Sequence, residues 1–435
     1  MNSATRAAAV LCSALSLAAT AAVAAQPADQ VDKSVLAHAK VSMKGKHPDL
    51  KSFGAQVGNV DTIVNFQGSF STAGVDGNGN PNTQWPWTMV GHSPAAGGTT
   101  RINAPIVPVS VRLLDANGNQ RFVNGQPLFL DGSQHLEDLL NSPLFSKTTF
   151  TSSSEPTQFT DAVQRATFWS QMKQNWHTHL DPSVQPGYTI EIPLGHYQFS
   201  LNADGSCCAF VLLDANNFSA ALFPPTFPVD NTTVMGAEEL SGAATTKTLA
   251  VLLFQDTYLY ENGNPSDCCV LGFHSIDFEP GVPANGNVQR AYVMAYASWI
   301  TPGLFNGGLA DITAMSHELA ETFNDPLVLA FSSSGGACGA VGEPICLNTT
   351  PWWLSPNGNC QNDLEVGDVI ENLPNGVNTI TMRGVAYHPQ NVALLQWFVS
   401  GHNSDALDGA FSYPDPSVLP GPSVSEQVGC TGPLN

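Results

Sequence analysis

The eleven residues from Ser316 to Pro326, Ser-His-Glu-Leu-Ala-Glu-Thr-Phe-Asn-Asp-Pro, restrict the structure of this chain more than any other segment. If they form a helix, His317 and Glu321 stand at positions i and i+4 and project from one face, like paired ligands in zinc hydrolases. Glu318 then has the position of a general base. The usual pattern is His-Glu-x-x-His, so Glu321 departs from it, and a solvated helix face without metal is the alternative interpretation.

The residues around this motif favour a helix. Asp311 can cap its start, and Asp325 followed by Pro326 ends it. An apolar stripe lies on a different face from the motif and comprises Ile312, Met315, Leu319 and Phe323.

A metal site needs at least a third protein ligand, and the acidic cluster at residues 363–371 can supply it. Within this cluster we select Glu365-Val-Gly-Asp368. Glu365 would bind the metal and Asp368 would orient His317, or the two roles are reversed. Asp325 is a third candidate, although its place before proline takes it off the helix. The alternative is that residues 363–371 form only a polar turn.

The N-terminus has the pattern of an export signal over residues 1–25. Arg6 is the only charged residue there, an apolar stretch covers residues 7–19, and Val23-Ala-Ala25 suits cleavage before Gln26. No later stretch is long and apolar enough to span a membrane. We therefore expect a secreted protein, with the periplasm as the alternative compartment and no membrane association after signal removal.

Residues 26–60 form a basic N-terminal segment. This segment is either a removable pro-piece or a flexible tail, and the sequence does not decide between them. Five of the eight lysines of the chain fall in this segment, at Lys33, Lys40, Lys44, Lys46 and Lys51.

Eight cysteines remain after the signal, an even number in an exported chain, so we expect disulfides. A cysteine-rich zinc site is disfavoured because no Cys-x-x-Cys spacing occurs. The adjacent pair Cys207-Cys208 could cross-link to the adjacent pair Cys268-Cys269. The other four cysteines could pin the loops after the motif, Cys338 with Cys346 and Cys360 with Cys430.

The charge balance is strongly acidic. Fifteen Lys and Arg face 36 Asp and Glu, a net charge of −21, and loss of Arg6 with the signal makes it −22. Nucleic acid and anionic membranes are therefore disfavoured partners. The sequence leaves the oligomeric state open.

Residues 62–253 show mostly strand signals. Residues 106–114 predict a strand before a turn at 115–119, and residues 210–213 predict a strand before a turn at 214–217. One helix is predicted at about Thr160 to Trp176.

Two further histidines, His177 and His179, have alternating strand spacing. They could chelate a metal if both faced one way. Because the sequence shows no acidic or third histidine neighbour, we interpret them as structural or surface residues.

Several segments together resemble one known family over residues 270–400, namely the phosphate-induced, EXORDIUM-like secreted proteins and related bacterial secreted proteins. The segments are His317-Glu-Leu-Ala-Glu321, Asn324-Asp-Pro-Leu-Val328, Glu365-Val-Gly-Asp368 and Leu395-Gln-Trp-Phe398. The resemblance implies an exported protein with a site like that of zincin metallopeptidases. The chain departs from the family where Val369-Ile-Glu371 replaces an expected cysteine, which leaves the local disulfides open.

These observations predict an α+β protein stabilised by disulfides. A β-rich lobe at residues 61–260 would pack on a zincin-like lobe at residues 261–435 that carries the motif helix.

The expected function is a secreted metal-dependent peptidase that acts on a protein or peptide. Zinc held by His317, Glu321 and either Glu365 or Asp368 would activate water, and Glu318 would accept the proton. Two carboxylate ligands also suit a harder ion such as manganese. The alternative is a non-catalytic secreted protein that binds a polysaccharide or the cell envelope and holds a structural metal or none.

Overall fold

The computed structural model describes residues 27–37, 39–44, 60–75, 81–224, 230–279, 281–327, 349–399 and 403–423. The expected signal peptide and the cysteines Cys338, Cys346 and Cys430 lie outside the described residues. Within the described part of the chain, no helix is long and apolar enough to cross a membrane.

Seven α-helices occur in the described residues. They are α1 (Ser34–Ala37), α2 (Leu136–Asn141), α3 (Phe159–Thr167), α4 (Ala215–Leu222), α5 (Val234–Ser241), α6 (Thr313–Asn324) and α7 (Leu395–Phe398).

Twelve strands form the central sheet. They are β1 (Ser42–Lys44), β2 (Val60–Asp61), β5 (Thr99–Leu113), β8 (Phe129–Leu130), β9 (His177–Val184), β10 (Tyr188–Ile192), β11 (Tyr197–Leu201), β12 (Cys207–Asp214), β13 (Leu249–Gln255), β14 (Thr257–Tyr260), β15 (Cys268–Glu279) and β16 (Gln289–Trp299).

The other strands form two-stranded sheets. These are β3 (Asn65–Val75) with β4 (Pro81–Val90), β6 (Phe122–Val123) with β7 (Gln126–Pro127), β17 (Thr349–Leu354) with β18 (Cys360–Asp363), β19 (Ile380–Met382) with β20 (Val385–Tyr387), and β21 (Val392–Ala393) with β22 (Ser412–Tyr413).

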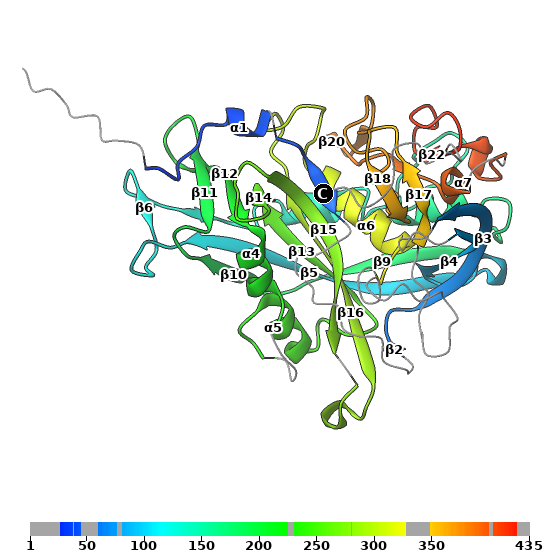
Figure 1. The fold of residues 1–435 in the computed structure, drawn as a ribbon, viewed down its shortest axis with the longest axis horizontal. Coiled ribbons are helices and arrows are strands. Elements are labelled where there is room, and N and C mark those ends of the chain that lie inside the picture. The colour runs from blue at the N-terminus through cyan, green and yellow to red at the C-terminus, as the bar shows by residue number, and fades with distance from the viewer. Residues whose placement is uncertain are drawn as a thin grey trace, which may run out of the picture.

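The central sheet has the order β10-β5-β13-β16-β15-β14-β12-β11 and mixes parallel with antiparallel pairs (Figure 1). The fold is therefore of the mixed α+β kind, with helices and a curled, strand-rich sheet. Strands from both sides of the expected lobe boundary at 260/261 belong to this one sheet, because β13 pairs with β16 and β14 with β15.

Helices cover both faces of the sheet, as the burial of the residues of β13 illustrates. All seven of its residues are buried, as in strands that are covered on both faces. Leu249, Val251 and Leu253 belong to the core that contains α6. The alternate residues Ala250, Leu252 and Phe254 belong to a second core with α4 and α5.

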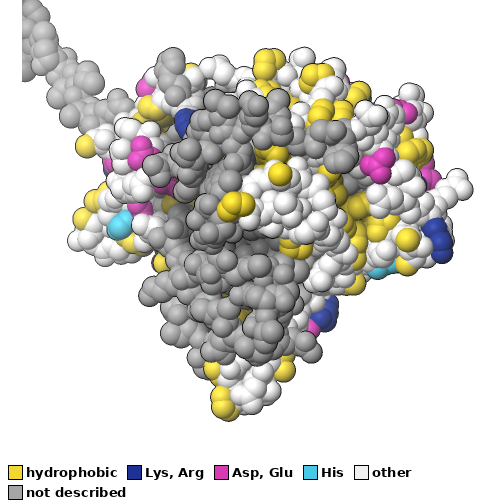
Figure 2. Space-filling view, turned by 45° about the vertical axis from the view of Figure 1, so that its right-hand side comes forward, with side chains coloured by type: hydrophobic (Ala, Val, Ile, Leu, Met, Phe, Trp, Pro, Cys, Tyr) yellow, Lys and Arg dark blue, Asp and Glu magenta, His cyan; other side chains and the backbone are white. Residues whose placement is uncertain are grey.

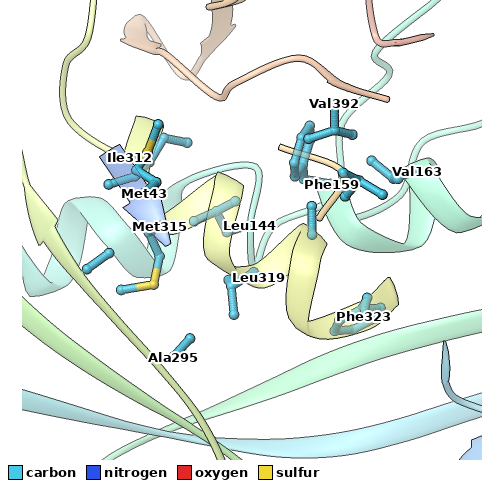
Figure 3. Packing of buried hydrophobic residues seen from close by; sticks show 14 of the residues in the cluster. Met43, Leu144, Phe159, Val163, Ala295, Ile312, Met315, Leu319, Phe323 and Val392 are labelled. Atoms are coloured by element: carbon cyan, nitrogen blue, oxygen red, sulfur yellow. The ribbon is translucent and has the colours of Figure 1, made fainter. Parts of the chain in front are cut away.

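Helix α6 packs against β15 and β16 through the predicted stripe. Ile312, Met315, Leu319 and Phe323 are all buried, and Figure 3 shows them along one side of the helix together with Met43, Leu144 and Ala295. All twelve residues of α6 are buried, so the helix is central rather than amphipathic. The alternative of a solvated helix face is therefore wrong.

The two ends of α6 compare differently with the sequence prediction. The helix ends as predicted, with Asp325 as its C-cap before Pro326. The predicted cap at the start is wrong, because Ile312 occupies the N-cap position and no side chain caps the helix there. Asp311 instead accepts hydrogen bonds from the backbone N–H groups of Ile312 (2.6 Å) and His388 (2.8 Å).

The strand and turn at residues 106–119 are confirmed. β5 covers the strand, and Asp115 closes the turn by accepting hydrogen bonds from the N–H groups of Asn117 and Asn119. The strand at residues 210–213 is also confirmed in β12. The turn predicted after it is wrong, because Asp214 caps α4 by accepting from the N–H of Asn217 at 3.0 Å.

The helix predicted from Thr160 to Trp176 ends nine residues early, at Thr167. Phe168 and Trp176 are both buried, and their rings meet edge to face with centroids 5.8 Å apart. The chain leaves the helix so that Trp176 can pack there, while Trp169 is exposed. Tertiary packing thus outweighs the helical pattern of the sequence.

No disulfide joins the two pairs of adjacent cysteines to each other. Cys207 bonds to Cys208, and Cys268 bonds to Cys269. The predicted cross-link between the pairs is therefore wrong. Cys360 is also disulfide-bonded, and the other expected pairs involve cysteines outside the described residues.

Candidate metal centre

Helix α6 places His317 beside Glu321, as the i, i+4 spacing predicts. The Nε2 atom of His317 lies 3.0 Å from Oε2 of Glu321 and 3.4 Å from Oδ1 of Asp368. The side chains of His317 and Glu321 are 0% exposed, and that of Asp368 is 19% exposed. One histidine nitrogen and two carboxylate oxygens therefore converge at a buried point.

Gln390 fixes which nitrogen of His317 carries a proton. Its side-chain N–H donates to the carbonyl of Gly367 at 2.7 Å, so its amide oxygen faces Nδ1 of His317 at 3.1 Å. Because that oxygen only accepts, Nδ1 must donate, and the lone pair of the neutral ring lies on Nε2. Nε2 has no hydrogen-bond partner among the described residues, and neither has Oε2 of Glu321. A cation or a proton is needed between these atoms.

The loop before Asp368 holds the other oxygen of Glu321. The backbone N–H groups of Gly367 and Asp368 donate to Oε1 at 2.9 and 3.1 Å. This leaves Oε2 directed at His317. Glycine is required at 367, because a Cβ atom there would lie 2.4 Å from Nδ1 of His317.

The pKa values show how strongly the site favours positive charge. Burial lowers the pKa of His317, but the carboxylates of Glu321 and Asp368 outweigh burial and raise it well above its ordinary value. Burial raises the pKa of Glu321, but His317 outweighs it and the result is lowered. The site therefore binds a proton tightly when no metal ion competes for the same atoms.

Glu318 lies on the neighbouring side of the helix and faces His274 of β15. Its Oε2 is 3.3 Å from Nδ1 of His274, and Oε1 has no hydrogen-bond partner among the described residues. Burial, followed by the charge of Glu321, raises the pKa of Glu318 well above its ordinary value. Gly272 leaves room for this carboxyl group, since a Cβ atom there would lie 2.9 Å from Oε1.

His274 was missed by the sequence analysis. Its Nε2 lies 3.1 Å from the carbonyl oxygen of Asp325, and its Nδ1 lies 3.6 Å from Oε2 of Glu321. Burial lowers its pKa to about 4. The only local signal is a histidine inside an apolar strand, and it lies 43 positions before His317, so spacing could not reveal the contact.

Glu365 is not one of the three converging groups, although its carboxyl group lies within hydrogen-bond reach of Glu321. Its nearest histidine contact is 3.9 Å, from Oε2 to Nε2 of His274. Burial, then the charge of Glu321, raises its pKa well above the ordinary value. Of the two arrangements left open by the sequence, the geometry favours Asp368 as the ligand, because its Oδ1 and Nε2 of His317 face the same point.

The histidines of β9 do have an acidic neighbour, which corrects the sequence-based interpretation. Asp161 of α3 is fully buried, and its Oδ2 lies 2.8 Å from Nδ1 of His177 and 3.7 Å from Nε2 of His179. Asp161 also accepts hydrogen bonds from Thr157 (2.6 Å) and from the N–H of Thr178 (2.6 Å). This network ties α3 to β9, and the three side chains could also hold a metal ion, since their ligand atoms lie within 4.8 Å of one another.

The donor set at His317, Glu321 and Asp368 fits a metal ion. Imidazole nitrogen and carboxylate oxygen are ligands of both zinc and manganese. Two of the converging atoms are buried without a hydrogen bond, which is costly unless a cation is bound or a proton is taken up.

Basic residues do not crowd the described surface seen in Figure 2, where the Lys and Arg side chains are few and separate.

No known protein-family model matches this chain, and none of the curated proteins or solved structures with which it was compared matches it either.

Proposed function

We propose that this chain is an exported, metal-dependent hydrolase that cleaves peptide bonds. The observation that carries the proposal is the convergence of His317 Nε2, Glu321 Oε2 and Asp368 Oδ1 next to a buried glutamate, Glu318. In this proposal, residues 261–435 contain the zincin-like part, and residues 1–25 direct export. The resemblance to the EXORDIUM-like secreted proteins supports both points.

The chemistry follows from the roles of the side chains. Bound zinc or manganese lowers the pKa of a water molecule and polarises a carbonyl group. His317, Glu321 and Asp368 would hold the ion, and Gln390 would orient His317 by its hydrogen bond. Glu318 would accept the proton from water. Burial raises the pKa of this carboxyl group, and the nearby cation would favour its ionised form, which is the form that can act as a base.

A second function rests on the burial of the site. The side chains of His317, Glu318 and Glu321 are all fully buried, which also suits a structural cation in a non-catalytic secreted binding protein. The two functions differ in their need for Glu318, because a structural cation held by His317, Glu321 and Asp368 does not require a base.

A Glu318→Gln variant separates these functions. Peptide-library cleavage and bound metal are measured in parallel on the mature wild type, on this variant, and on Glu191→Gln as a control at an exposed glutamate. A peptidase should lose activity by about 10²- to 10⁴-fold in Glu318→Gln while keeping its metal. Wild-type protein that holds metal and cleaves no peptide would favour the binding protein.

A further inference from the structure

The first described segment of the chain lies across the candidate catalytic region. We call residues 27–37 and 39–44 the N-terminal strap. At one end the strap joins β11, because the N–H of Val31 donates to the carbonyl of Phe199 (2.9 Å) and the N–H of Phe199 donates to that of Asp29 (3.0 Å). At the other end β1 pairs with β15 in parallel, next to α6 (Figure 1).

Met43 has the most deeply buried side chain of the strap. Its side chain is 0% exposed and lies with Ile312 and Met315 at the start of α6 (Figure 3). Its backbone N–H donates to the carboxylate of Glu371 at 2.8 Å. The N–H of Glu371 in turn donates to the carbonyl of Gly367 at 3.1 Å. One strap residue thus contacts both the motif helix and the loop that carries Asp368.

A cavity of about 210 Å³ is lined both by the strap and by residues next to the metal centre. The strap contributes Leu36, Ala37, Ala39 and Val41, and Ile370 and Gln390 are also part of the lining. Gln390 is the residue that holds Nδ1 of His317. Removal of the strap would therefore expose the wall of the cavity that is one side chain away from the candidate metal ligands.

We propose that the strap occupies the groove in which an extended peptide substrate binds, so that the chain with its strap in place is the closed form. This inference rests on the proposed peptidase function and names its substrate class. Added strands bind through main-chain hydrogen bonds, while side-chain pockets give selectivity. The buried site of Met43 selects a peptide with an unbranched or γ-branched apolar side chain, such as Met or Leu, at that position.

The contacts of the strap suit a segment that opens locally. β1 has three residues and is paired with a single strand, and its register shifts between Ser42 and Lys44. Its other polar anchors include the N–H of Cys269, which donates to the carbonyl of Lys40 (3.0 Å), and the side chains of Asn306 and Asn372, which donate to the carbonyls of Ala37 (2.8 Å) and Val41 (3.3 Å). Elements with few backbone hydrogen bonds open at a smaller free-energy cost than the whole fold.

Asp29 and Arg121 fix the far end of the strap. The Nη2 atom of Arg121 lies 2.8 Å from Oδ1 of Asp29, and Nη1 contacts Oδ2 of the same carboxylate. This anchor is distant in sequence from Met43, so weakening the Met43 contact should free the β1 end first. Such removal or displacement of a covering segment is a known way of exposing a site.

The test uses the full mature chain with Met43→Ser. The control is Met89→Ser, which makes the same change at an equally buried methionine of β4. Two measurements are made without catalysis, namely amide hydrogen exchange and the fluorescence anisotropy of a labelled peptide, Ala-Lys-Val-Ser-Met-Lys, which copies residues 39–44.

We expect Met43→Ser to raise exchange in residues 27–44 about tenfold or more while the rest of the sheet is unchanged. The labelled peptide should bind to this variant and not to the wild type or to Met89→Ser, and a peptide with serine in place of the methionine should compete poorly. Failure of the peptide to bind Met43→Ser, or an equal rise of exchange across the whole sheet, would overturn the proposal.

The readouts keep this proposal separate from the proposed function. If Met43→Ser binds the peptide but the protein cleaves no peptide, the proposed peptidase function is contradicted and the proposed peptide-binding groove is retained. If the protein has peptidase activity but Met43→Ser shows no peptide binding and no local rise in hydrogen exchange, the proposed groove is contradicted and the proposed peptidase function is retained.

Discussion

The Nδ1 atom of His317 lies 3.1 Å from the amide oxygen of Gln390, and this contact directs the other ring nitrogen at Glu321 and Asp368. Gln390 follows the acidic loop in the sequence, yet it determines the tautomer of a histidine on the motif helix. The backbone N–H of Gln390 also donates a hydrogen bond to the hydroxyl group of Ser316, at 2.8 Å. The metal centre therefore depends on a residue that carries none of its ligand atoms.

Replacement of Gln390 by leucine should weaken metal binding by about 10- to 100-fold, because the ring of His317 loses the acceptor that orients it. Metal affinity is measured by competition with a chelator, with circular dichroism as a check of folding. The matched control is Gln84→Leu at an exposed position on β4. An unchanged affinity in Gln390→Leu would contradict the orienting role.

A Gly367→Ala change should reduce metal affinity while the helices and sheet persist. The new Cβ atom would lie 2.4 Å from Nδ1 of His317 and would push the ring from its place. Gly421→Ala is the control, since a Cβ atom at that position has no neighbour within 4 Å. Equal metal affinities for the two variants would show that the loop does not hold His317 in position.

The two acidic candidates for the third ligand should separate by mutation. Asp368 Oδ1 lies 3.4 Å from Nε2 of His317, whereas the nearest histidine contact of Glu365 is to His274. We expect Asp368→Asn to lose the metal under conditions in which Glu365→Gln keeps it. Bound metal per chain after dialysis measures the difference. The reverse result would make Glu365 the ligand.

Stability should depend on pH through Glu239 of α5. Burial, then the charge of Asp277, raises the pKa of Glu239 from 4.5 to about 10. A raised carboxyl pKa stabilises the fold fully below about pH 4.5, and this stability is lost as the pH rises towards the folded-state pKa. Glu239→Gln should therefore stabilise the protein relative to wild type more at pH 8 than at pH 5.

The expected gain at pH 8 is about 1–3 kcal/mol in the free energy of unfolding, the usual cost of a buried polar group without adequate partners. Urea unfolding at pH 5 and pH 8 measures it. Glu137→Gln makes the same change at an exposed site and is the control. A gain of equal size at both pH values would contradict the raised pKa.

Local sequence patterns predicted the parts of the site that lie on one element. The i, i+4 spacing placed His317 against Glu321, and the apolar stripe correctly marked the buried helix. The end of α6 before Pro326 was also predicted, because proline excludes the helical conformation of the residue before it.

Contacts between distant elements could not be predicted in the same way. His274 comes from β15 and Gln390 from a loop, and only the pairing of the sheet with α6 brings them to the motif. Asp161 reaches His177 from α3 for the same reason. The strap is a further case, since its sequence shows basic residues, while its buried contact is made by Met43.

The most direct test of the account is bound metal per chain in the purified mature protein, after resupply with zinc and with manganese. The wild type is compared with His317→Ala and with His196→Ala, a control at an exposed histidine. We expect one ion per chain in wild type and in His196→Ala, and none in His317→Ala. Correctly folded wild-type protein without bound metal would contradict it.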